Sequence, residues 1–311
     1  MLLFVRIYNN ISEITNLQNA IVTIGTFDGV HLGHQKIIKR LIEIKQKQGG
    51  GTLLFTFDPH PRKVLFPEQT DLRLITTTQE KCDLLQQFGI DHVLVFPFTK
   101  AFSKMPAADY IKDVIINGLK TKTLVIGYDH RFGSSREGNI NMIKAMSVDH
   151  KFSVEEIPVQ EINSLNISSS RIRTALEKGD IETANDNLGY SFFIIGEVFK
   201  GKQLGRTIGY PTANIRIEHV DKLIPKIGVY AVSVIIEEKK FKGMLNIGVN
   251  PTTDDSKELK IEVNVFDFNG DLYGTKIKVE FIKRIRNEQK FTNLDELKQQ
   301  LAKDKIACIN V

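Results

Sequence analysis

Two stretches of this sequence combine residue types and spacing that suit phosphate chemistry, and the first is GTFDGVHLGHQ at residues 25–35. It follows a β-rich apolar run and leads into a helical pattern, where a helix N-terminus offers free N–H groups and a positive dipole end. His31 and His34 are three residues apart, so both rings can face one ligand and stabilise charge on phosphate oxygens. Three glycines allow the backbone to approach such a ligand closely: Gly25, Gly29 and Gly33.

The histidine pair has two other interpretations. Histidines at this spacing also occur as solvated residues of a helix. A metal site would need a third nitrogen or sulfur ligand, and the neighbouring sequence has none. The succession of strand, glycine loop and helix favours phosphate chemistry over both.

Three more polar stretches fall where we predict strand ends or a helix start. They are TFDPHP at 56–61, GYDHRFG at 127–133 and ISSSRIR at 167–173. The carboxyl ends of parallel strands meet at one edge of a sheet, so one pocket can collect all three stretches. Each also has a purely structural interpretation, as turn prolines, hinge glycines or a serine helix cap. Hydroxyls at a helix start, followed by Arg171 and Arg173, also suit the phosphates of ATP.

The second main stretch is GKQLGRTIGYPTANI at residues 201–215. Thr212 and Asn214 are two residues apart, so they point to the same side of an extended segment. Their hydroxyl and amide oxygens are hard ligands that suit Mg²⁺ bound with ATP. The glycines upstream make a loop whose backbone can wrap phosphates: Gly201, Gly205 and Gly209. Taken alone, the loop and the PTAN sequence also fit a plain turn.

Glu262 is the candidate general base of the C-terminal half. It lies in IEVNVFDFNGDLYG at 261–274, on the same predicted strand face as Asn264. Phosphorylating an alcohol requires a proton acceptor at the hydroxyl. Only His219 among the histidines lies beyond residue 150, so a carboxylate is the predicted base. The alternative is an ordinary solvent-facing strand residue.

The elements that must position these residues change in kind along the chain. Up to about residue 187, short β-rich runs alternate with helical patterns, which indicates a parallel, doubly wound sheet. The predicted strands are 21–25, 52–57, 92–96, 123–127 and 152–157. The predicted helices are 34–48, 78–88 behind a capping box of Thr77 and Glu80, 107–118, 139–149, and one or two within 168–187.

From about residue 190 the pattern becomes β-rich. The predicted strands are 191–199, 229–236, 241–247, 259–268 and 276–285, followed by a helix over about 293–303 behind Thr292 and Asn293. Short strands at this spacing indicate a small antiparallel barrel or sandwich. We therefore predict an α/β domain over residues 1–187 and a β domain with a C-terminal helix over 188–311.

Length and composition agree with two soluble domains. The chain has 311 residues, of which 41% are hydrophobic and 25% charged. Its apolar runs are far shorter than the roughly 18 residues of a membrane span, and its start has no signal-peptide cleavage site. Cys82 and Cys308 are too far apart for a CxxC motif, which argues against a disulfide framework and a zinc site. We therefore predict a cytoplasmic protein with no membrane partner.

The surplus of positive charge is small and uneven. The formal net charge is +5, with +4 on residues 188–311 and +1 on residues 1–187. The only dense basic run, KRIR at 283–286, alternates as a strand does and fits a solvated face. Anionic small molecules account for the surplus equally well, so we predict no nucleic-acid partner.

The N-terminal motifs resemble a known superfamily. An HxGH sequence between a strand and a helix is similar to the nucleotidyltransferases, which transfer a nucleotidyl group and release pyrophosphate. With the three further polar stretches, it resembles the FMN adenylyltransferase module of bacterial bifunctional riboflavin kinase/FAD synthetases.

The C-terminal motifs resemble the riboflavin kinase family, over residues 190–303. The resemblance rests on PTAN, NIGVNPT at 246–252, the strand carrying Glu262 and the closing helix. Asn264 stands where many members have His, and Ser170 stands where Thr is commoner in the other module. The combined resemblance covers nearly the whole chain, with the adenylyltransferase before the kinase.

This resemblance implies a bifunctional enzyme of flavin cofactor synthesis. The C-terminal domain would phosphorylate riboflavin with ATP to give FMN, with Glu262 as base and with Thr212 and Asn214 on Mg²⁺. The N-terminal domain would adenylylate FMN to FAD and release pyrophosphate, with His31 and His34 at the reacting phosphates. The partners would be riboflavin, FMN and ATP, and no oligomeric state is predicted. The resemblance further implies nucleotide and phosphate contacts at Gly25, Phe27, Gly33, Ser169, Ser170, Arg171, Gly201, Gly205 and Gly209, and flavin contacts at Phe57, Pro59 and Asp129.

Two alternatives belong to other functional classes. One is a nucleotidyltransferase for a different phosphorylated substrate, with a barrel that only binds flavin. The other is a flavin-sensing or RNA-binding regulator without turnover. A regulator of that kind is expected to have lost HLGH, PTAN or Glu262, and all three are intact.

Overall fold

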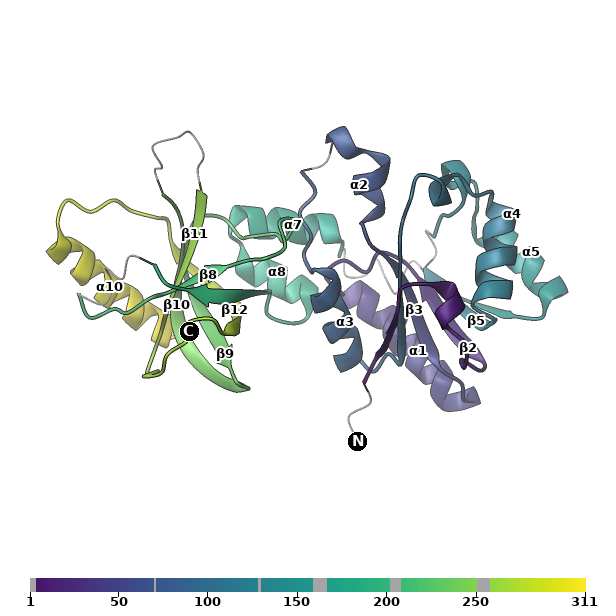
Figure 1. Cartoon of the computed structure of the whole chain (residues 1–311), viewed down its shortest axis with the longest axis horizontal. Coiled ribbons are helices and arrows are strands. Elements are labelled where there is room, and N and C mark those ends of the chain that lie inside the picture. The colour runs from purple at the N-terminus through teal and green to yellow at the C-terminus, as the bar shows by residue number, and fades with distance from the viewer. Residues whose placement is uncertain (1–3, 70, 128–129, 159–166, 202–207, 251–257) are drawn as a thin grey trace. The chain divides into compact units, whose positions relative to one another are not determined.

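The computed structural model of the chain divides into two compact units, Met1–Ser169 and Ser170–Val311. Each unit is treated by itself below (Figure 1). The structure describes residues 4–69, 71–127, 130–158, 167–201, 208–250 and 258–311. Within these ranges, no helix combines the length and the apolar character needed to cross a membrane.

The first unit is built on a six-stranded parallel sheet with the strand order β1-β4-β3-β2-β5-β6. The chain moves outward from β2 through β3 and β4 on one side, and through β5 and β6 on the other. The point where the order reverses, between β2 and β5, is where such sheets bind ligands. The strands are β1 (Arg6–Tyr8), β2 (Ala20–Ile24), β3 (Thr52–Phe57), β4 (His92–Phe96), β5 (Thr121–Gly127) and β6 (Ser153–Ile157).

Helical segments connect the strands of this sheet. Helix α3 begins with the predicted capping box, because the side chains of Thr77 and Glu80 each accept a hydrogen bond from the other residue's backbone N–H. The α-helices are α1 (Leu32–Gln48), α2 (Pro61–Leu65), α3 (Thr78–Gln87), α4 (Ala107–Asp109) and α5 (Ile140–His150). The other segments are the π-helical η4 (Tyr110–Gly118) and the short 3₁₀ turns η1 (Ile11–Glu13), η2 (Pro67–Gln69), η3 (Phe102–Lys104) and η5 (Ser134–Arg136).

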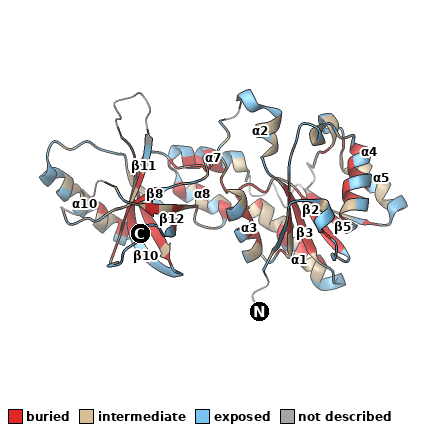
Figure 2. Cartoon of the chain, in the orientation of Figure 1, coloured by how far each residue is buried: buried red, intermediate tan, exposed pale blue. Residues whose placement is uncertain are grey.

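Both faces of the sheet are buried, as Figure 2 shows for its central strands. Alternate residues of β2, such as Val22 and Ile24, pack in one cluster with Tyr110 and Ile115 of η4 and with residues of α5. Helix α1 contacts β2, β3 and β5. Strands buried on both faces are near-continuous apolar runs, which is why the sequence revealed them.

The second unit is a closed antiparallel barrel with the strand order β10-β11-β8-β7-β12-β9. Its strands are β7 (Phe193–Phe199), β8 (Ala213–Arg216), β9 (Gly228–Ile236), β10 (Lys239–Asn250), β11 (Glu258–Val265) and β12 (Lys276–Arg286). Helices α7 (Ser169–Lys178) and α8 (Ile181–Leu188) precede the barrel, and α10 (Leu294–Ile309) follows it. Asn293 caps α10 through its side-chain oxygen, as predicted, and this helix contacts β9, β10 and β12.

The predicted fold class is confirmed, and the structure differs from the predicted elements in several details. Strands β1 and β8, of three and four residues, were not predicted because segments this short show no clear period. Helix α10 continues to Ile309, beyond the predicted end near residue 303. Almost the whole of α7 and α8 falls in the second unit, since α8 packs on β12, whereas the sequence analysis placed these helices in the first domain.

A partly buried ion pair fastens the amino ends of β3 and β4 to α1. Lys45 Nζ lies 2.6 and 2.8 Å from the two carboxylate oxygens of Asp91, which also accepts from the N–H and hydroxyl of Thr52, both at 2.9 Å. Burial would raise the pKa of Asp91, but the hydrogen bonds from Lys45 and Thr52 outweigh it and lower this pKa below its ordinary value. The ionised carboxylate therefore stabilises the first unit.

We expect Asp91→Asn to lower the free energy of unfolding by about 1–3 kcal/mol at pH 7, because an amide leaves Lys45 without its charged partner. A depressed folded pKa contributes stability above the unfolded value near about 4, and this contribution is lost as the pH falls through the folded value. The difference between variant and wild type should therefore shrink at pH 3.5. Urea unfolding followed by circular dichroism at both pH values measures it.

Glu156→Gln is the matched control for this experiment. Glu156 pairs with Lys144 at 2.7 Å, but the two side chains are 33% and 49% exposed. Exposed pairs contribute at most about 1 kcal/mol, so the control should be nearly neutral. An Asp91→Asn loss of the same size at pH 3.5 and pH 7 would contradict the role given to the ionised carboxylate.

Candidate functional site

The loop after β2 is shaped by backbone conformations that few residues adopt. Phe27 has a φ of 47°, Gly29 of 83° and Val30 of 36°. Gly25 lies so close to the ring of Phe27 that a Cβ there would be 3.0 Å from the Cε2 atom. These residues turn the chain from the end of β2 into α1 within a few steps, which exposes the first turn of that helix to a ligand.

Asp28 ties this loop to the chain segment before α3. Its buried carboxylate accepts hydrogen bonds from the N–H groups of Ile75 and Thr76, at 3.3 and 3.1 Å. The N–H of Gly29 in turn donates to the hydroxyl of Thr76 at 3.0 Å. Ser169 donates from its hydroxyl to the carbonyl of Asp28 at 2.9 Å, which brings the predicted serine cluster to this loop.

The two predicted histidines stack on each other at the start of α1. His31 is the N-cap, and its Nδ1 accepts from the N–H of His34 at 3.4 Å. The two ring centroids are 3.7 Å apart, and the Phe27 ring lies 4.6 Å from that of His34. The Nδ1 atom of His34 is buried and has no hydrogen-bond partner among the described residues. This pair is therefore preorganised and still has a polar atom to satisfy.

The surroundings of His34 favour its neutral form. Burial is the largest cause that lowers its pKa well below the ordinary value, and the nearby positive charges of His31 and Lys81 lower it further. A neutral imidazole has one N–H donor and one acceptor nitrogen. His34 can therefore hydrogen-bond to a phosphate oxygen without carrying a charge of its own.

A cavity of about 750 Å³ opens at the carboxyl ends of β2, β3 and β5, across the point where the strand order reverses. Gly25 and Thr26 from the loop after β2 line it, together with Phe57 at the end of β3. Further aromatic lining comes from Phe66, Phe98, Phe102, Tyr110 and Phe132, and cationic lining from Arg62, Lys104, Arg131 and Arg136. No described carboxylate lines it. Such a cavity suits a planar, anionic ligand.

The structure collects most, but not all, of the predicted N-terminal residues. Gly33 is buried in the first turn of α1, beside His34. Ser170 and Arg171 follow Ser169 in the first turn of α7, on its exposed side. Pro59 is not part of the cavity wall, to which Pro61 contributes instead. Asp129 lies outside the described residues.

In the barrel, strand pairing brings the predicted base to a predicted metal ligand. Glu262 of β11 stands directly opposite Asn214 of β8 and, on its other side, opposite Asn246 of β10. Directly paired residues of an antiparallel sheet have their Cβ atoms about 4.5–5.5 Å apart on the same face. The predicted shared face of Glu262 and Asn264 is confirmed, because both line one cavity while Val263 lines another.

These two cavities meet at Thr212. The first, of about 260 Å³, lies between the barrel and α10, and its polar lining includes Thr212, Asn246, Lys260 and Glu262. The second, of about 610 Å³, is lined by Thr212 together with Phe268, Asp271 and Tyr273. Thr212 is thus positioned to touch a ligand in either cavity.

Two of the predicted loop glycines differ in their surroundings. Gly201 packs against the amide of Asn214, which is 4% exposed, so any Cβ at residue 201 would displace that amide. Gly209 has a φ of 86° and open space around it. Gly205 lies outside the described residues.

Sequence reasoning missed several residues of the first barrel cavity. Lys260 forms an ion pair with Glu262 at 2.7 Å, and its place two residues earlier on the strand was a usable signal. Arg286 and Asp304 also line this cavity. They come from β12 and α10, and no local pattern relates two residues so far apart in the chain.

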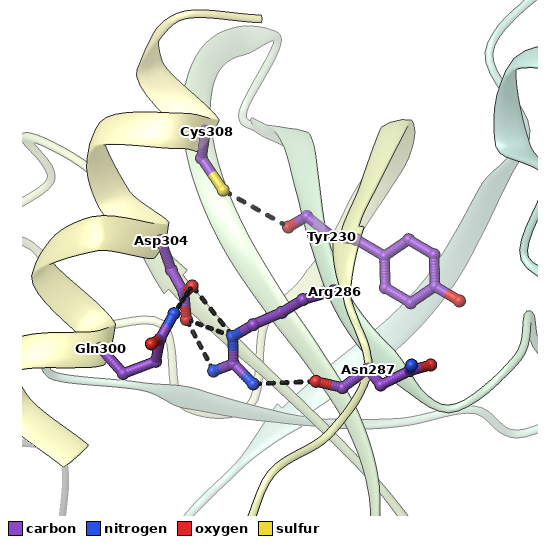
Figure 3. A network of polar contacts seen from close by, with 6 residues as sticks. All are labelled: Tyr230, Arg286, Asn287, Gln300, Asp304 and Cys308. Carbon is purple, nitrogen blue, oxygen red and sulfur yellow. Dashed lines mark hydrogen bonds and ion pairs between the residues drawn. The ribbon is translucent and has the colours of Figure 1, made fainter. Parts of the chain in front are cut away.

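Arg286 and Asp304 join α10 to the barrel, as Figure 3 shows. The Nε and Nη2 atoms of Arg286 bind the Asp304 carboxylate at 2.7–3.0 Å, and Gln300 donates to it at 2.8 Å. Asp304 is 2% exposed. One turn on, the thiol of Cys308 faces the carbonyl of Tyr230 at 3.9 Å, and burial raises the pKa of this thiol to about 12. Arg286 and Asp304 of this network line the cavity.

Comparisons with known proteins match both halves of the chain. The model of the FAD synthetase family matches residues 13–171, and that of the riboflavin kinase family matches residues 188–311. A "bifunctional riboflavin kinase/FMN adenylyltransferase" of Buchnera aphidicola subsp. Schizaphis graminum is 41% identical over 304 residues, which cover 96% of each chain. A protein of the same name from Bacillus subtilis is 38% identical over 288 residues, 92% of this chain and 90% of its own.

Among solved structures, one similar chain is described as a macrolide-efflux protein from Streptococcus pneumoniae. It matches with a TM-score of 0.88 and 32% identity, over 99% of both chains. Macrolide efflux is the function named for that protein, and it is not transferred to this chain. The two family models and the two bifunctional relatives agree with each other.

We expect Asp304→Asn to loosen α10 from the barrel, because it removes the charge that Arg286 binds. Hydrogen bonds to charged groups contribute about 1.5–3 kcal/mol each, so amide hydrogen exchange in the second half of α10 should accelerate about 10- to 100-fold. Exchange measured by mass spectrometry in the full chain tests this. Lys298→Ala, on an exposed position of the same helix, should leave exchange unchanged. Equal acceleration in both variants would show that the ion pair does not anchor the helix.

Proposed function

This chain belongs to the bifunctional riboflavin kinase/FMN adenylyltransferase family, and we propose that its first unit performs adenylyl transfer while its second is the kinase. The enzyme phosphorylates riboflavin to FMN and adenylylates FMN to FAD. The observation that carries the assignment of residues is the pairing of Glu262 with Asn214, which puts a carboxylate next to an oxygen ligand on one barrel face.

In the proposed kinase reaction, riboflavin occupies the cavity between the barrel and α10, and ATP occupies the cavity that shares Thr212 with it. Glu262 accepts the proton of the riboflavin 5'-hydroxyl as that oxygen attacks the γ-phosphorus and ADP leaves. Lys260, at 2.7 Å, orients the Glu262 carboxylate. The backbone around Gly201 and Gly209 binds the phosphates.

Mg²⁺ fits this site by the chemistry of its donors. The Thr212 hydroxyl and the Asn214 amide oxygen are neutral oxygen ligands, and Mg²⁺ prefers oxygen donors together with phosphate and water. Packing of Gly201 against Asn214 fixes that amide in place. When bound, the ion neutralises charge on the transferred phosphate.

In the proposed adenylyl transfer, FMN binds in the aromatic cavity of the first unit, with its flavin ring among Phe57 and the neighbouring aromatic side chains. A phosphate oxygen of FMN attacks the α-phosphorus of ATP, and pyrophosphate leaves. His31 and His34 donate hydrogen bonds to the reacting phosphates at the N-terminus of α1. Ser169, Ser170 and Arg171 contribute further donors to the nucleotide.

A cytoplasmic location remains part of the proposal. Cys82 and Cys308 are both buried free thiols. Burial raises the pKa of Cys82 to about 11 and that of Cys308 to about 12, so both are poor nucleophiles at neutral pH. Such thiols suit a compartment that keeps cysteines reduced.

Substitutions in the two units should have opposite effects. Glu262→Gln should lower riboflavin phosphorylation by about 10²- to 10⁴-fold, because the base is lost, and leave FMN adenylylation unchanged. His31→Asn removes the imidazole but keeps a good N-cap, so it should lower FMN adenylylation by about 10²- to 10³-fold and spare the kinase. The two activities are measured by supplying riboflavin or FMN with ATP and separating FMN and FAD by chromatography.

Matched controls are available in both units. Glu218→Gln changes an exposed barrel carboxylate, and His150→Ala changes an exposed histidine of α5. Both should keep both activities. Loss of both activities in folded Glu262→Gln or His31→Asn would contradict the division of labour between the units.

The proposed metal ligands predict a metal dependence that differs between the two reactions. Thr212→Val keeps the side-chain shape but removes the hydroxyl oxygen. We expect the Mg²⁺ concentration for half-maximal riboflavin phosphorylation to rise about 10- to 100-fold, while that for FMN adenylylation stays the same. Rates measured across a Mg²⁺ series in buffered EDTA test this. An unchanged kinase dependence would remove Thr212 from the ligand set.

A further inference from the structure

Lys81 is a buried lysine that is not among the proposed substrate contacts of the first unit. It lies in the first half of α3, beneath the loop that leads from β2 into α1, and is 6% exposed. Lysine is rarely buried, because removing an ammonium from water costs several kcal/mol unless charges and hydrogen bonds compensate. A buried lysine next to a reaction site therefore calls for a specific role.

The ammonium of Lys81 holds the backbone of the loop. Its Nζ donates to the carbonyl of Thr26 at 3.1 Å and to the hydroxyl of Thr56 at 2.8 Å. The Thr56 hydroxyl in turn donates a hydrogen bond to the same Thr26 carbonyl at 3.0 Å. The Thr26 carbonyl thus accepts two hydrogen bonds. Thr26 directly precedes the strained Phe27, and it lines the large cavity.

Nearby carboxylates compensate the charge of Lys81, and this charge also acts on His34. Burial lowers the pKa of Lys81, while the nearby carboxylates of Asp28 and Asp58 favour its charged form. The groups that act on His34 are its own burial, His31 and Lys81, and all three lower the pKa of His34. Thr26 is followed in the chain by Phe27, whose ring packs on the His34 ring.

We propose that Lys81 is a positioning residue for adenylyl transfer, which holds the Thr26 carbonyl so that Phe27 supports His34. Its positive charge also adds to the burial and the His31 charge that lower the pKa of His34. The inference rests on the proposed role of His34 in the first unit. Lys81 acts from behind the loop and need not touch a substrate. Asp28 and its partners Ile75 and Thr76 hold the next part of the same loop.

Lys81→Met tests both parts of this role, because it keeps the apolar stem and removes the ammonium. We expect FMN adenylylation at pH 8 to fall about 10- to 100-fold, since a buried hydrogen-bonded anchor worth about 1.5–3 kcal/mol is lost. The ratio of the rate at pH 6 to that at pH 8 should fall a further 3- to 10-fold or so below the wild-type ratio. The reason is that His34 loses a neighbouring positive charge and protonates at higher pH.

The direct readout is the titration of His34, followed by NMR of the full-length protein labelled at histidine. In Lys81→Met the His34 resonance should titrate at higher pH than in wild type, and in Lys81→Arg, which keeps the charge, at the wild-type pH. Thr56→Val leaves the charge but removes the hydroxyl bridge, so it should slow adenylylation without moving the titration. It also tests the geometry should Lys81→Met fail to fold.

Two controls make the outcomes separable. Riboflavin phosphorylation in the same preparations reports that the second unit is intact, and Lys39→Met removes an exposed lysine of α1. An unshifted His34 titration and an unchanged pH profile in active Lys81→Met, or wild-type rates in Thr56→Val, would overturn the positioning role. If wild type itself formed no FAD from FMN while Lys81→Met still shifted the titration, the proposed adenylyl transfer would fail and the charge effect on His34 would stand.

Discussion

The contact between β8 and β11 is the constraint on which the proposed kinase site depends. Among the described residues, two pairs join these strands, Asn214 with Glu262 and Ala213 with Val263. Side chains alternate along a strand, so a slip of one residue would turn Glu262 away from α10 and put Val263 in its place. Closure of the barrel prevents this slip, because β8 is held on its other edge by β7. A four-residue strand thus obtains its register from the whole barrel.

In the first unit, side-chain hydrogen bonds instead of strand pairing hold the proposed site in place. The loop after β2 has neither helix nor strand to fix it, and its backbone adopts unfavourable conformations at Phe27 and Val30. Asp28 ties that loop to the segment before α3, and Lys81 ties it to α3 itself. The cost of burying these charges is offset by hydrogen bonds to backbone groups that would otherwise be unsatisfied. Burial of His34, and to a smaller extent the charges of His31 and Lys81, lowers the pKa of His34.

In both units, ion pairs that are at least partly buried join elements that are distant in the chain. Arg286 and Asp304 hold α10 over the barrel face, just as Lys45 and Asp91 hold α1 at the opposite end of the first sheet from the histidines. Removing one member of such a pair leaves a charge without compensation, which makes these contacts specific as well as stabilising. Exposed surface pairs such as Lys276 with Glu218 lack this property.

The sequence alone determined the class of each unit and indicated the residues that we propose for the two sites. Buried parallel strands and their helices carry strong periodic signals, and HLGH, PTAN and Glu262 combine unusual residue types at short spacing. The short strands β1 and β8 escaped prediction because three or four residues do not define a period. Tertiary structure alone decided that Glu262 faces Asn214, that Lys81 lies behind Thr26 and that Arg286 meets Asp304. Such contacts join residues dozens of positions apart, and only packing and strand register bring them together.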